Sequence, residues 1–428
     1  MQPSLATEWE TSGDQLTWTF TLRDDVTFHD GSPMTSADVV YTFDRIIDEE
    51  LNSAYRFATV KDITAPDDTT VVFELKEPTP NLLATLGGFK GLGIVEEQNV
   101  TSGEIKDTPI GTGPFAVAAY QRGQSIELSA NPDYWGGPPE IGGVTFTFVS
   151  DPTVALQNLL SGEVQWTDNL PPQQVESLAS NEDVELSTAP SNDYWYLAPN
   201  EARPPFDDVR VRQALAFGID RDAIVEAAKF GQATVNQTAI PSTSEWYYDY
   251  EPYSYDPDRA KELLAEAGAS DLSFELMVTD EYPETVAAAQ VIASEMDDIG
   301  VTMDIRTLDF GTWLDEQGKG NFDVFMLSWL GNIDPDEFYY AQHRTGATFN
   351  FQGYSNPEVD QLLDEGQTET DTAARKEIYD QAAQQIVDDA SYIYLYNPDV
   401  AQAWAPELDG YVARGDRAIR FADVTLAD

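Results

Sequence analysis

Hydrophobic and polar residues alternate near the start of the chain. Trp18, Phe20 and Leu22 are separated by threonines, which is the two-residue period of a half-buried strand. A helical face follows, made of apolar residues three or four positions apart: Val39, Phe43, Ile46 and Ile47. This helix has a clear start, because Thr35 can cap it and Asp38 stands three positions later as the reciprocal partner.

Patterns in the second part of the chain indicate helices packed on a sheet. Residues 272–279 and 301–309 have the composition of buried strands, and residues 283–300 between them have that of a helix. This unit has the length needed for a parallel strand pair. Residues 206–231 predict a long helix or a helix pair, and residues 321–331 predict a further buried strand. The order of elements therefore predicts an α/β or α+β fold.

The charge of the chain changes this picture most strongly. Its 428 residues include 76 Asp and Glu against 23 Lys and Arg, which gives a formal net charge of −53. The acidic residues are spread along the whole chain, so they form a surface and not a tail. A field of this sign repels nucleic acid and anionic lipid. It is typical of a halophilic protein, because salt at 1 M screens the repulsion within about 3 Å.

Residue types that carry catalysis or metal binding are scarce. The chain has no cysteine and two histidines, His29 and His343, and neither has a second His at metal-ligand spacing. His29 beside Asp30 fits a turn better than a catalytic dyad. Glycine-rich segments at 111–115 and 311–320 lack the spacing of nucleotide-binding loops. The sequence predicts no catalytic residue, metal or cofactor, while a hydrolase with paired carboxylates stays open as an alternative.

Aromatic residues are the remaining candidates for a binding surface. They concentrate at residues 193–197, 245–255, 337–342 and 392–396. Tyr and Trp carry polar edges and often line ligand clefts, but they also fill protein cores. Both interpretations stay open on the residues alone.

Motifs spread over nearly the whole chain resemble one protein family. The segments that carry the resemblance are LATEWETSGDQLTWTFTLRDDVTFHDGSPMTSADVVYTFDRI (5–46), TPIGTGPF (108–115), NPDYWGG (131–137), LLSGEVQW (159–166), PPFDDVRVRQALAFGIDRDAIV (204–225), AKELLAEAG (260–268), NFDVFMLSW (321–329) and ARKEIYDQAAQQIVDDA (374–390). In this order they resemble the family 5 extracytoplasmic solute-binding proteins of ABC importers, of the dipeptide-, oligopeptide- and nickel-binding type.

The resemblance implies an α/β fold of the two-lobe periplasmic-binding-protein kind, type II, in its three-subdomain peptide-binding variant. Hinge strands would cross between the lobes near residues 192–197 and 397–400, with the ligand in the cleft between them. The implied division is an extra subdomain of the first lobe at 1–96, a first-lobe core at 97–190 plus 399–428, and a second lobe at 191–398.

The resemblance also implies a function without covalent chemistry. Such a protein captures a peptide or similar solute and delivers it to ABC permease subunits in the membrane. We expect a monomer outside the cytoplasm, from a haloarchaeon, N-terminally truncated and lipid-anchored through an upstream segment absent from this chain. Oligosaccharides, nickel and other solutes stay open as ligands. A sensor subunit for chemotaxis would share the binding step.

One departure from the family pattern affects the expected ligand site. Relatives that bind peptides hold the ammonium group with an Asp just after the Trp of the FDV strand. Here Asn332 takes that position, and Asp334 could serve with a one-residue shift. Basic residues that meet the peptide carboxylate in some relatives are replaced by Gln317 and Met326. Losing both anchors would change the ligand, because an unpaired buried charge is costly.

The candidate ligand-binding residues are aromatic and polar residues in or near these segments: Trp329, Asn332, Asp334, Tyr194, Trp195 and Trp313, followed by Trp166, Trp246 and His343. We expect Asp334 to pair with an ammonium group. We expect the aromatic rings to stack on side chains or on sugar faces.

Overall fold

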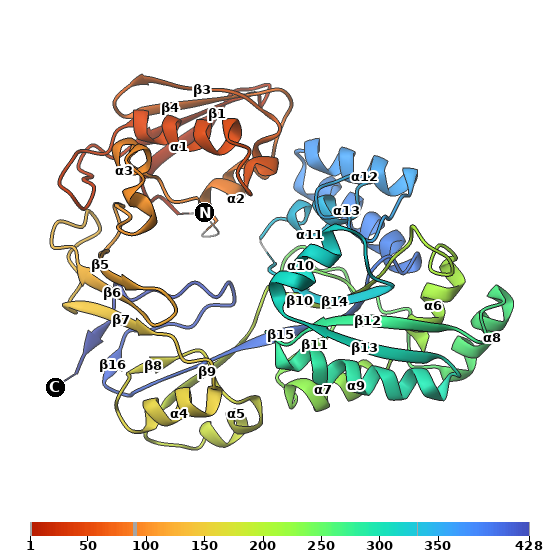
Figure 1. Ribbon diagram of the computed structural model, residues 1–428. Coiled ribbons are helices and arrows are strands. Elements are labelled where there is room, and N and C mark those ends of the chain that lie inside the picture. The colour runs from red at the N-terminus through yellow and green to blue at the C-terminus, as the bar shows by residue number, and fades with distance from the viewer. Residues whose placement is uncertain (1, 89–91, 332, 428) are drawn as a thin grey trace.

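One long strand, β15 (Ile393–Trp404), joins the two sides of the molecule. Its first part pairs with β10 (Tyr194–Pro199) and its last part pairs with β9 (Glu185–Pro190), both antiparallel. Figure 1 shows β15 running from one side to the other. We call the residues up to 190 and from 399 onward the first half, and those between them the second half. The computed structural model describes residues 2–88, 92–331 and 333–427.

The first half begins with a four-stranded antiparallel sheet that packs against α1 (Ser36–Asp48). Its strands in spatial order are β1 (Ala6–Thr11), β2 (Thr17–Leu22), β4 (Thr70–Leu75) and β3 (Val60–Asp67). The remaining short helices are η1 (Ala54–Phe57), α2 (Leu82–Gly87), α3 (Glu97–Thr101) and η2 (Glu104–Lys106). Phe20 and Phe43 both pack edge-on against Phe73 in the core, so the predicted strand alternation and helical face are confirmed.

Two local features position this sheet. The capping box of α1 is present as predicted, with the Thr35 backbone N–H donating to Asp38 Oδ2 at 2.8 Å. His29 holds the distant segment 111–113 against this sheet, because Gly111 N donates to its Nδ1 at 3.2 Å and its Nε2 lies 3.0 Å from the Gly113 carbonyl. The Asp30 side chain accepts from the Ser32 backbone within its own turn. His29 and Asp30 therefore have structural roles, as the sequence indicated.

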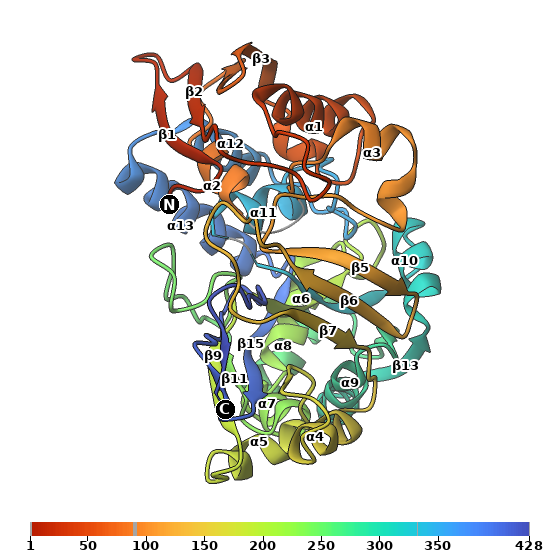
Figure 2. The same ribbon diagram turned by 90° about the vertical axis from the view of Figure 1, so that its left-hand side faces the viewer.

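The rest of the first half consists of small sheets and short helices. A three-stranded antiparallel sheet contains β5 (Phe115–Gln121), β6 (Ser125–Ala130) and β7 (Gly143–Thr147). The elements between it and the second half are α4 (Pro152–Leu160), β8 (Trp166–Thr167), α5 (Pro172–Leu178) and β9. The C-terminal tail adds β16 (Leu408–Asp409) and β17 (Thr425–Leu426), which pair with each other. Figure 2 shows β5–β7 between the N-terminal sheet and α4 with α5.

The second half is built on the larger part of the main sheet, in the order β11-β15-β10-β14-β12-β13. Its further strands are β11 (Ala233–Val235), β12 (Ser273–Thr279), β13 (Thr302–Leu308) and β14 (Val324–Trp329). Its helices are α6 (Val209–Phe217), α7 (Arg221–Lys229), α8 (Pro257–Ala267), α9 (Pro283–Asp298), α10 (Phe310–Gly318), α11 (Asp336–His343), α12 (Pro357–Thr368) and α13 (Thr372–Asp388). The predicted helix pair and the parallel unit β12–α9–β13 are confirmed.

Candidate functional site

The crossing between the halves is held by buried hydrogen bonds to the backbone. Asn397 Nδ2 on β15 donates to the Asp193 carbonyl at 2.8 Å, and the Ser191 hydroxyl donates to the Pro398 carbonyl at 2.6 Å. Asn236 Nδ2 donates to Asn397 Oδ1 at 2.7 Å, which orients the Asn397 amide. These contacts fix the two crossing segments against each other.

A buried carboxylate lies at this crossing. Asp193 Oδ1 accepts a hydrogen bond from Gly331 N at 3.2 Å, just beyond the end of β14. Asp193 Oδ2 lies 3.0 Å from Arg417 Nε in the C-terminal tail of the first half. The Asp193 side chain is 5% exposed, whereas that of Arg417 is 49% exposed. An ion pair from the tail of one half therefore reaches the hinge strand.

A polar pocket lies between the halves, away from the crossing. It has a volume of about 300 Å³ and is lined by η1 and α2 of the first half and by α11 and α12 of the second. Arg56 Nη2 lies 3.5 Å from Glu337 Oε1, and Asn81 Nδ2 donates to Asp336 Oδ2 at 3.1 Å. Burial and the neighbouring Asp334 raise the pKa of Asp336 to about 6. We call this the junction pocket.

Aromatic rings connect the junction pocket to the end of β14. Tyr55 of the first half packs edge-on against Phe349 at 5.4 Å between ring centroids, and Phe349 packs against Trp329 at 4.9 Å. Trp329 is half-buried and pairs with Tyr194 across β14 and β10. Among the described candidates from the sequence, Trp329 thus lies in an aromatic chain that reaches the other half.

Several other candidates have packing roles in the second half. Tyr194 is buried beneath Phe338, and Trp195 is buried between Tyr282 and Tyr396. Trp313 is fully buried, and its Nε1 lies 3.4 Å from the Met277 carbonyl. These rings support the sheet from which β10 and β14 extend to the crossing.

His343 is also fully buried, and it does not line the rim of a cleft. Its ring nitrogens lie 3.3 Å from the Ser391 hydroxyl and 3.1 Å from the Tyr394 hydroxyl. Burial lowers its pKa to about 3, so the ring is neutral at ordinary pH. This histidine is a core hydrogen-bonding residue.

Asp334 is already paired inside the protein. Its two carboxylate oxygens accept from Arg375 Nη1 and Nη2, each at 2.7 Å, and the pair is almost completely buried. Trp246 covers the same guanidinium, with the Arg375 carbon 5.4 Å from the ring centroid. Asp334, Trp246 and Arg375 therefore form one structural group.

The last two candidates lie elsewhere. Trp166 belongs to the first half, where it lines a groove of about 850 Å³ between β7, α4 and the C-terminal tail. Asn332 lies outside the described residues. The eight candidates that the structure describes are thus not brought together into one site.

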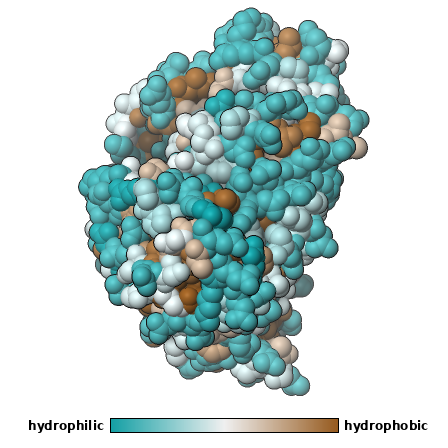
Figure 3. Space-filling model, turned by 90° about the vertical axis from the view of Figure 1, so that its right-hand side faces the viewer, coloured by the Kyte–Doolittle hydropathy of each residue, from teal (hydrophilic) through white to brown (hydrophobic). Residues whose placement is uncertain are grey.

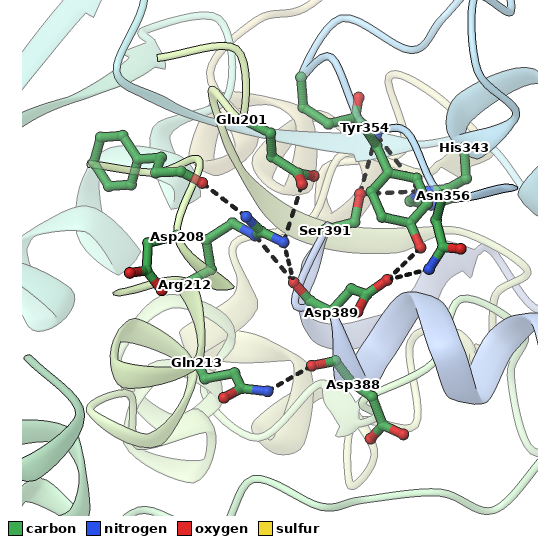
Figure 4. A network of polar contacts seen from close by, with 12 residues as sticks. Glu201, Asp208, Arg212, Gln213, His343, Tyr354, Asn356, Asp388, Asp389 and Ser391 are labelled. Atoms are coloured by element: carbon green, nitrogen blue, oxygen red, sulfur yellow. Dashed lines mark hydrogen bonds and ion pairs between the residues drawn. The ribbon is translucent and has the colours of Figure 1, made fainter. Parts of the chain in front are cut away.

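A second buried polar network surrounds Arg212 in the second half (Figure 4). Arg212 Nη2 lies 3.1 Å from Glu201 Oε2 and donates to the Asp389 carbonyl at 2.7 Å. The Asp389 carboxylate accepts from Tyr354 and Asn356. Burial raises the pKa of Glu201 to about 7, although Arg212 opposes the shift. Because Arg212 and Asp389 bind backbone or neighbouring side chains, this network joins α6 to the end of α13.

The described residues contain no group of three His, Cys, Asp or Glu side chains arranged to hold a metal ion. Within the same ranges, no helix is long and apolar enough to cross a bilayer. The molecule consists of two halves joined by a shared strand, with charged and aromatic contacts between them.

Comparison with known proteins shows which family this chain belongs to. Residues 1–350 match the family model of bacterial extracellular solute-binding proteins, family 5 Middle. The chain belongs to this family. Members are transport proteins that bind solutes outside the cytoplasm, which confirms the expectation that the chain is not an enzyme. The hydrolase alternative is therefore excluded.

Individual relatives agree with the family assignment. The dipeptide-binding protein of Escherichia coli is 30% identical over 460 residues, covering 99% of this chain and 85% of that protein. The solved structure of the periplasmic binding protein DppA of Helicobacter pylori, in complex with the peptide STSA, matches 99% of this chain and 89% of its own at 27% identity and a TM-score of 0.88. The dipeptide binding protein of a Pseudoalteromonas species, in complex with Met-Leu, gives a TM-score of 0.89 at 25% identity over 99% of this chain and 90% of its own. These structures confirm the predicted peptide-binding variant of the periplasmic-binding-protein fold.

Sequence reasoning missed the residues that connect the halves. Tyr55, Arg56 and Asn81 lie in short elements without a strong period, and Arg417 lies in an irregular tail. Asp193 is adjacent to the aromatic segment singled out above, but its charge was one of many acidic ones. An acidic residue next to an aromatic segment was the signal that the sequence offered.

Proposed function

We propose that this family member is the solute-binding subunit of an ABC importer and that it captures short peptides between its two halves. The observation that carries the proposal is β15, which pairs with β9 in one half and with β10 in the other. A shared strand lets the halves rotate toward each other around a solute without losing either sheet. The similarity to dipeptide-binding and peptide-complexed proteins supports peptide as the ligand class.

The proposal includes a division of the chain and a set of ligand contacts. Residues 1–96 form an extra subdomain, 97–190 with 399–428 the first-lobe core, and 191–398 the second lobe. The switch of β15 from β10 to β9 between Tyr396 and Asp399 supports this boundary. Trp329 lines the solute at the end of β14, and its partly exposed side chain supports this role. Asn332 belongs to the same set of proposed contacts and lies outside the described residues.

We propose further that the protein works at the cell surface in concentrated salt. The net charge of −53 supports this, as does the face in Figure 3, where hydrophilic residues dominate and hydrophobic ones form small separate groups. A haloarchaeal source and a lipid anchor belong to the same proposal. The bound protein then presents its closed form to the membrane permease.

The test is thermal unfolding in about 2–4 M KCl, where surface repulsion is screened. The protein is heated with di- to pentapeptides, with oligosaccharides or with nickel, since a ligand of the native state raises the midpoint by mass action. A rise with peptides alone is the expected result. A rise with sugars or nickel alone would keep the family and overturn the peptide assignment.

A further inference from the structure

Asp193 and Arg417 form an ion pair whose two members are held very differently. The Asp193 carboxylate is buried. The backbone of Asp193 is held on both sides, because its N–H donates to the Ser191 hydroxyl at 3.2 Å and its carbonyl accepts from Asn397. The guanidinium is half-exposed and meets the carboxylate through Nε. A half-exposed arginine is released at little cost, whereas a buried carboxylate must keep a cationic partner.

The Asp193 carboxylate lies beside the end of β14. Gly331 immediately precedes Asn332 in the sequence, and its backbone N–H donates to Asp193 Oδ1 at 3.2 Å. This approach is close because a Cβ on Gly331 would lie 1.6 Å from the Asn192 carbonyl oxygen. Asn332 carries no charge, and Asp334 is occupied by Arg375. Asp193 thus supplies a negative charge at a point where the β14 loop supplies none.

Arg417 is aimed at this carboxylate by a defined turn in the C-terminal tail. Its backbone N–H donates to the Arg414 carbonyl at 3.0 Å, and Ala418 N donates to Asp416 Oδ1 at 3.0 Å. Arg417 adopts φ of 61°, a left-handed conformation that is rare for a side chain of its size. Such strain persists where surrounding contacts fix the backbone, and here it directs a first-half cation to the second half.

We propose that Asp193 and Arg417 are exchangeable anchors for a zwitterionic peptide. The ammonium group of the ligand replaces Arg417 at Asp193, and the released guanidinium binds the carboxylate of the same ligand. The exchange leaves no buried charge without a partner, and the released guanidinium can bind the ligand carboxylate through two parallel N–H donors. This inference rests on the proposed function and names the part of the peptide that is recognised, namely its free termini.

The test pairs changes in the protein with changes in the ligand. The probe is the peptide with the largest midpoint shift in the panel above, together with its N-acetylated and C-amidated forms, titrated by calorimetry. With the unmodified protein, each blocked form should bind about tenfold more weakly or worse. In Asp193→Asn the free peptide should lose a similar factor, and acetylation should cost nothing more. In Arg417→Gln the free peptide should again bind about tenfold more weakly, and amidation of its C-terminus should cost no further affinity.

Matched variants separate these effects from general ones. Asp399→Asn removes another carboxylate at the crossing, and Arg414→Gln removes a similarly exposed arginine of the tail, which pairs with Asp416. Both should bind the free and blocked peptides as the unmodified protein does. The inference is overturned if Asp193→Asn keeps the full acetylation penalty, or, should that variant not unfold cooperatively, if Arg417→Gln keeps the full amidation penalty. Absence of any peptide binding by the unmodified protein would overturn the proposed function itself.

Discussion

Two buried carboxylates in the second half differ in how their charge is compensated. Asp334 shares a two-pronged contact with Arg375, whose guanidinium serves it on both oxygens. Glu201 shares Arg212 with two backbone carbonyls, those of Phe206 and Asp389. Burial therefore outweighs the arginine at Glu201 and raises its pKa to about 7.

Glu201→Gln should flatten the pH dependence of stability. The folded pKa of about 7 exceeds the ordinary 4.5, so the folded state holds the proton more tightly and stability falls as pH rises through this window. Glutamine does not ionise, so the variant should gain up to about 3 kcal/mol on the unmodified protein between pH 4.5 and 8. Denaturant unfolding at both pH values measures this. A gain equal to that of exposed Glu226→Gln would contradict the assignment.

Asp334→Ala should destabilise the fold rather than remove a ligand contact. It leaves Arg375 buried without its carboxylate, which costs about 3–5 kcal/mol. Below its lowered unfolding midpoint, the variant should still bind the panel peptide within a few-fold of the unmodified affinity. Calorimetry at a temperature where both proteins are folded decides this. Loss of binding by a still-folded variant would return Asp334 to the ligand site.

At the scale of elements, the end of β14 and the crossing strand come into unusually close contact. Gly331 leaves no room for a Cβ against the Asn192 carbonyl oxygen, and Phe338 of α11 closes the other side at 2.8 Å. The residue type is therefore fixed by packing between two strands and a helix, and not by a turn.

Gly331→Ala should separate β14 from the crossing. Backbone atoms must move, so we expect a loss of about 1–3 kcal/mol or more in unfolding free energy. The control is Gly318→Ala at the end of α10, where a Cβ meets nothing within 4 Å and the change should stay within about 1 kcal/mol. Equal effects of the two substitutions in urea unfolding would refute the close-contact argument.

The elements themselves were largely predictable, because their signals are local. The Thr35 cap, the alternation at Trp18–Leu22 and the β12–α9–β13 unit each follow from residues within one segment. The site was not predictable in the same way. Trp313 and His343 are residue types that often contact ligands, but their burial depends on strands far away in the sequence. Arg56 and Glu337 are ordinary surface residues until the fold brings them 3.5 Å apart.

At the scale of the whole molecule, two of the places where described residues join the halves differ in kind. One is the crossing at β15, and the other is the junction pocket with its Arg56–Glu337 and Asn81–Asp336 contacts. The crossing is covalent and permanent, whereas the pocket contacts can break. We therefore expect the pocket contacts to limit how far the halves open without a solute.

Combining Arg56→Gln with Asn81→Ala should open the unliganded molecule. Both changes remove contacts between the halves and leave each core intact, so the radius of gyration in solution scattering should increase. Addition of the panel peptide should restore the smaller value. Arg45→Gln removes an ion pair with Glu49 inside the first half and serves as the control. Coinciding scattering curves for the unliganded double variant and the unliganded unmodified protein would rule out that these contacts limit opening.

The acidic surface predicts a strong response to salt. Raising KCl from about 0.1 M to about 2 M shortens the Debye length from about 10 Å to below 3 Å, which removes most self-repulsion from a charge of −53. The unfolding midpoint should rise steeply with KCl. Sucrose stabilises by exclusion without screening and should raise it much less. A matching rise with both solutes would remove the halophilic proposal.

β15 also sets the order in which the chain can fold as it is made. This strand pairs with β8, β9, β10 and β11, and it is the last long strand to be synthesised, ending at Trp404. Neither half can complete its sheet until nearly all of the polypeptide has emerged. A nascent chain of this protein therefore remains without its central strand until late in translation.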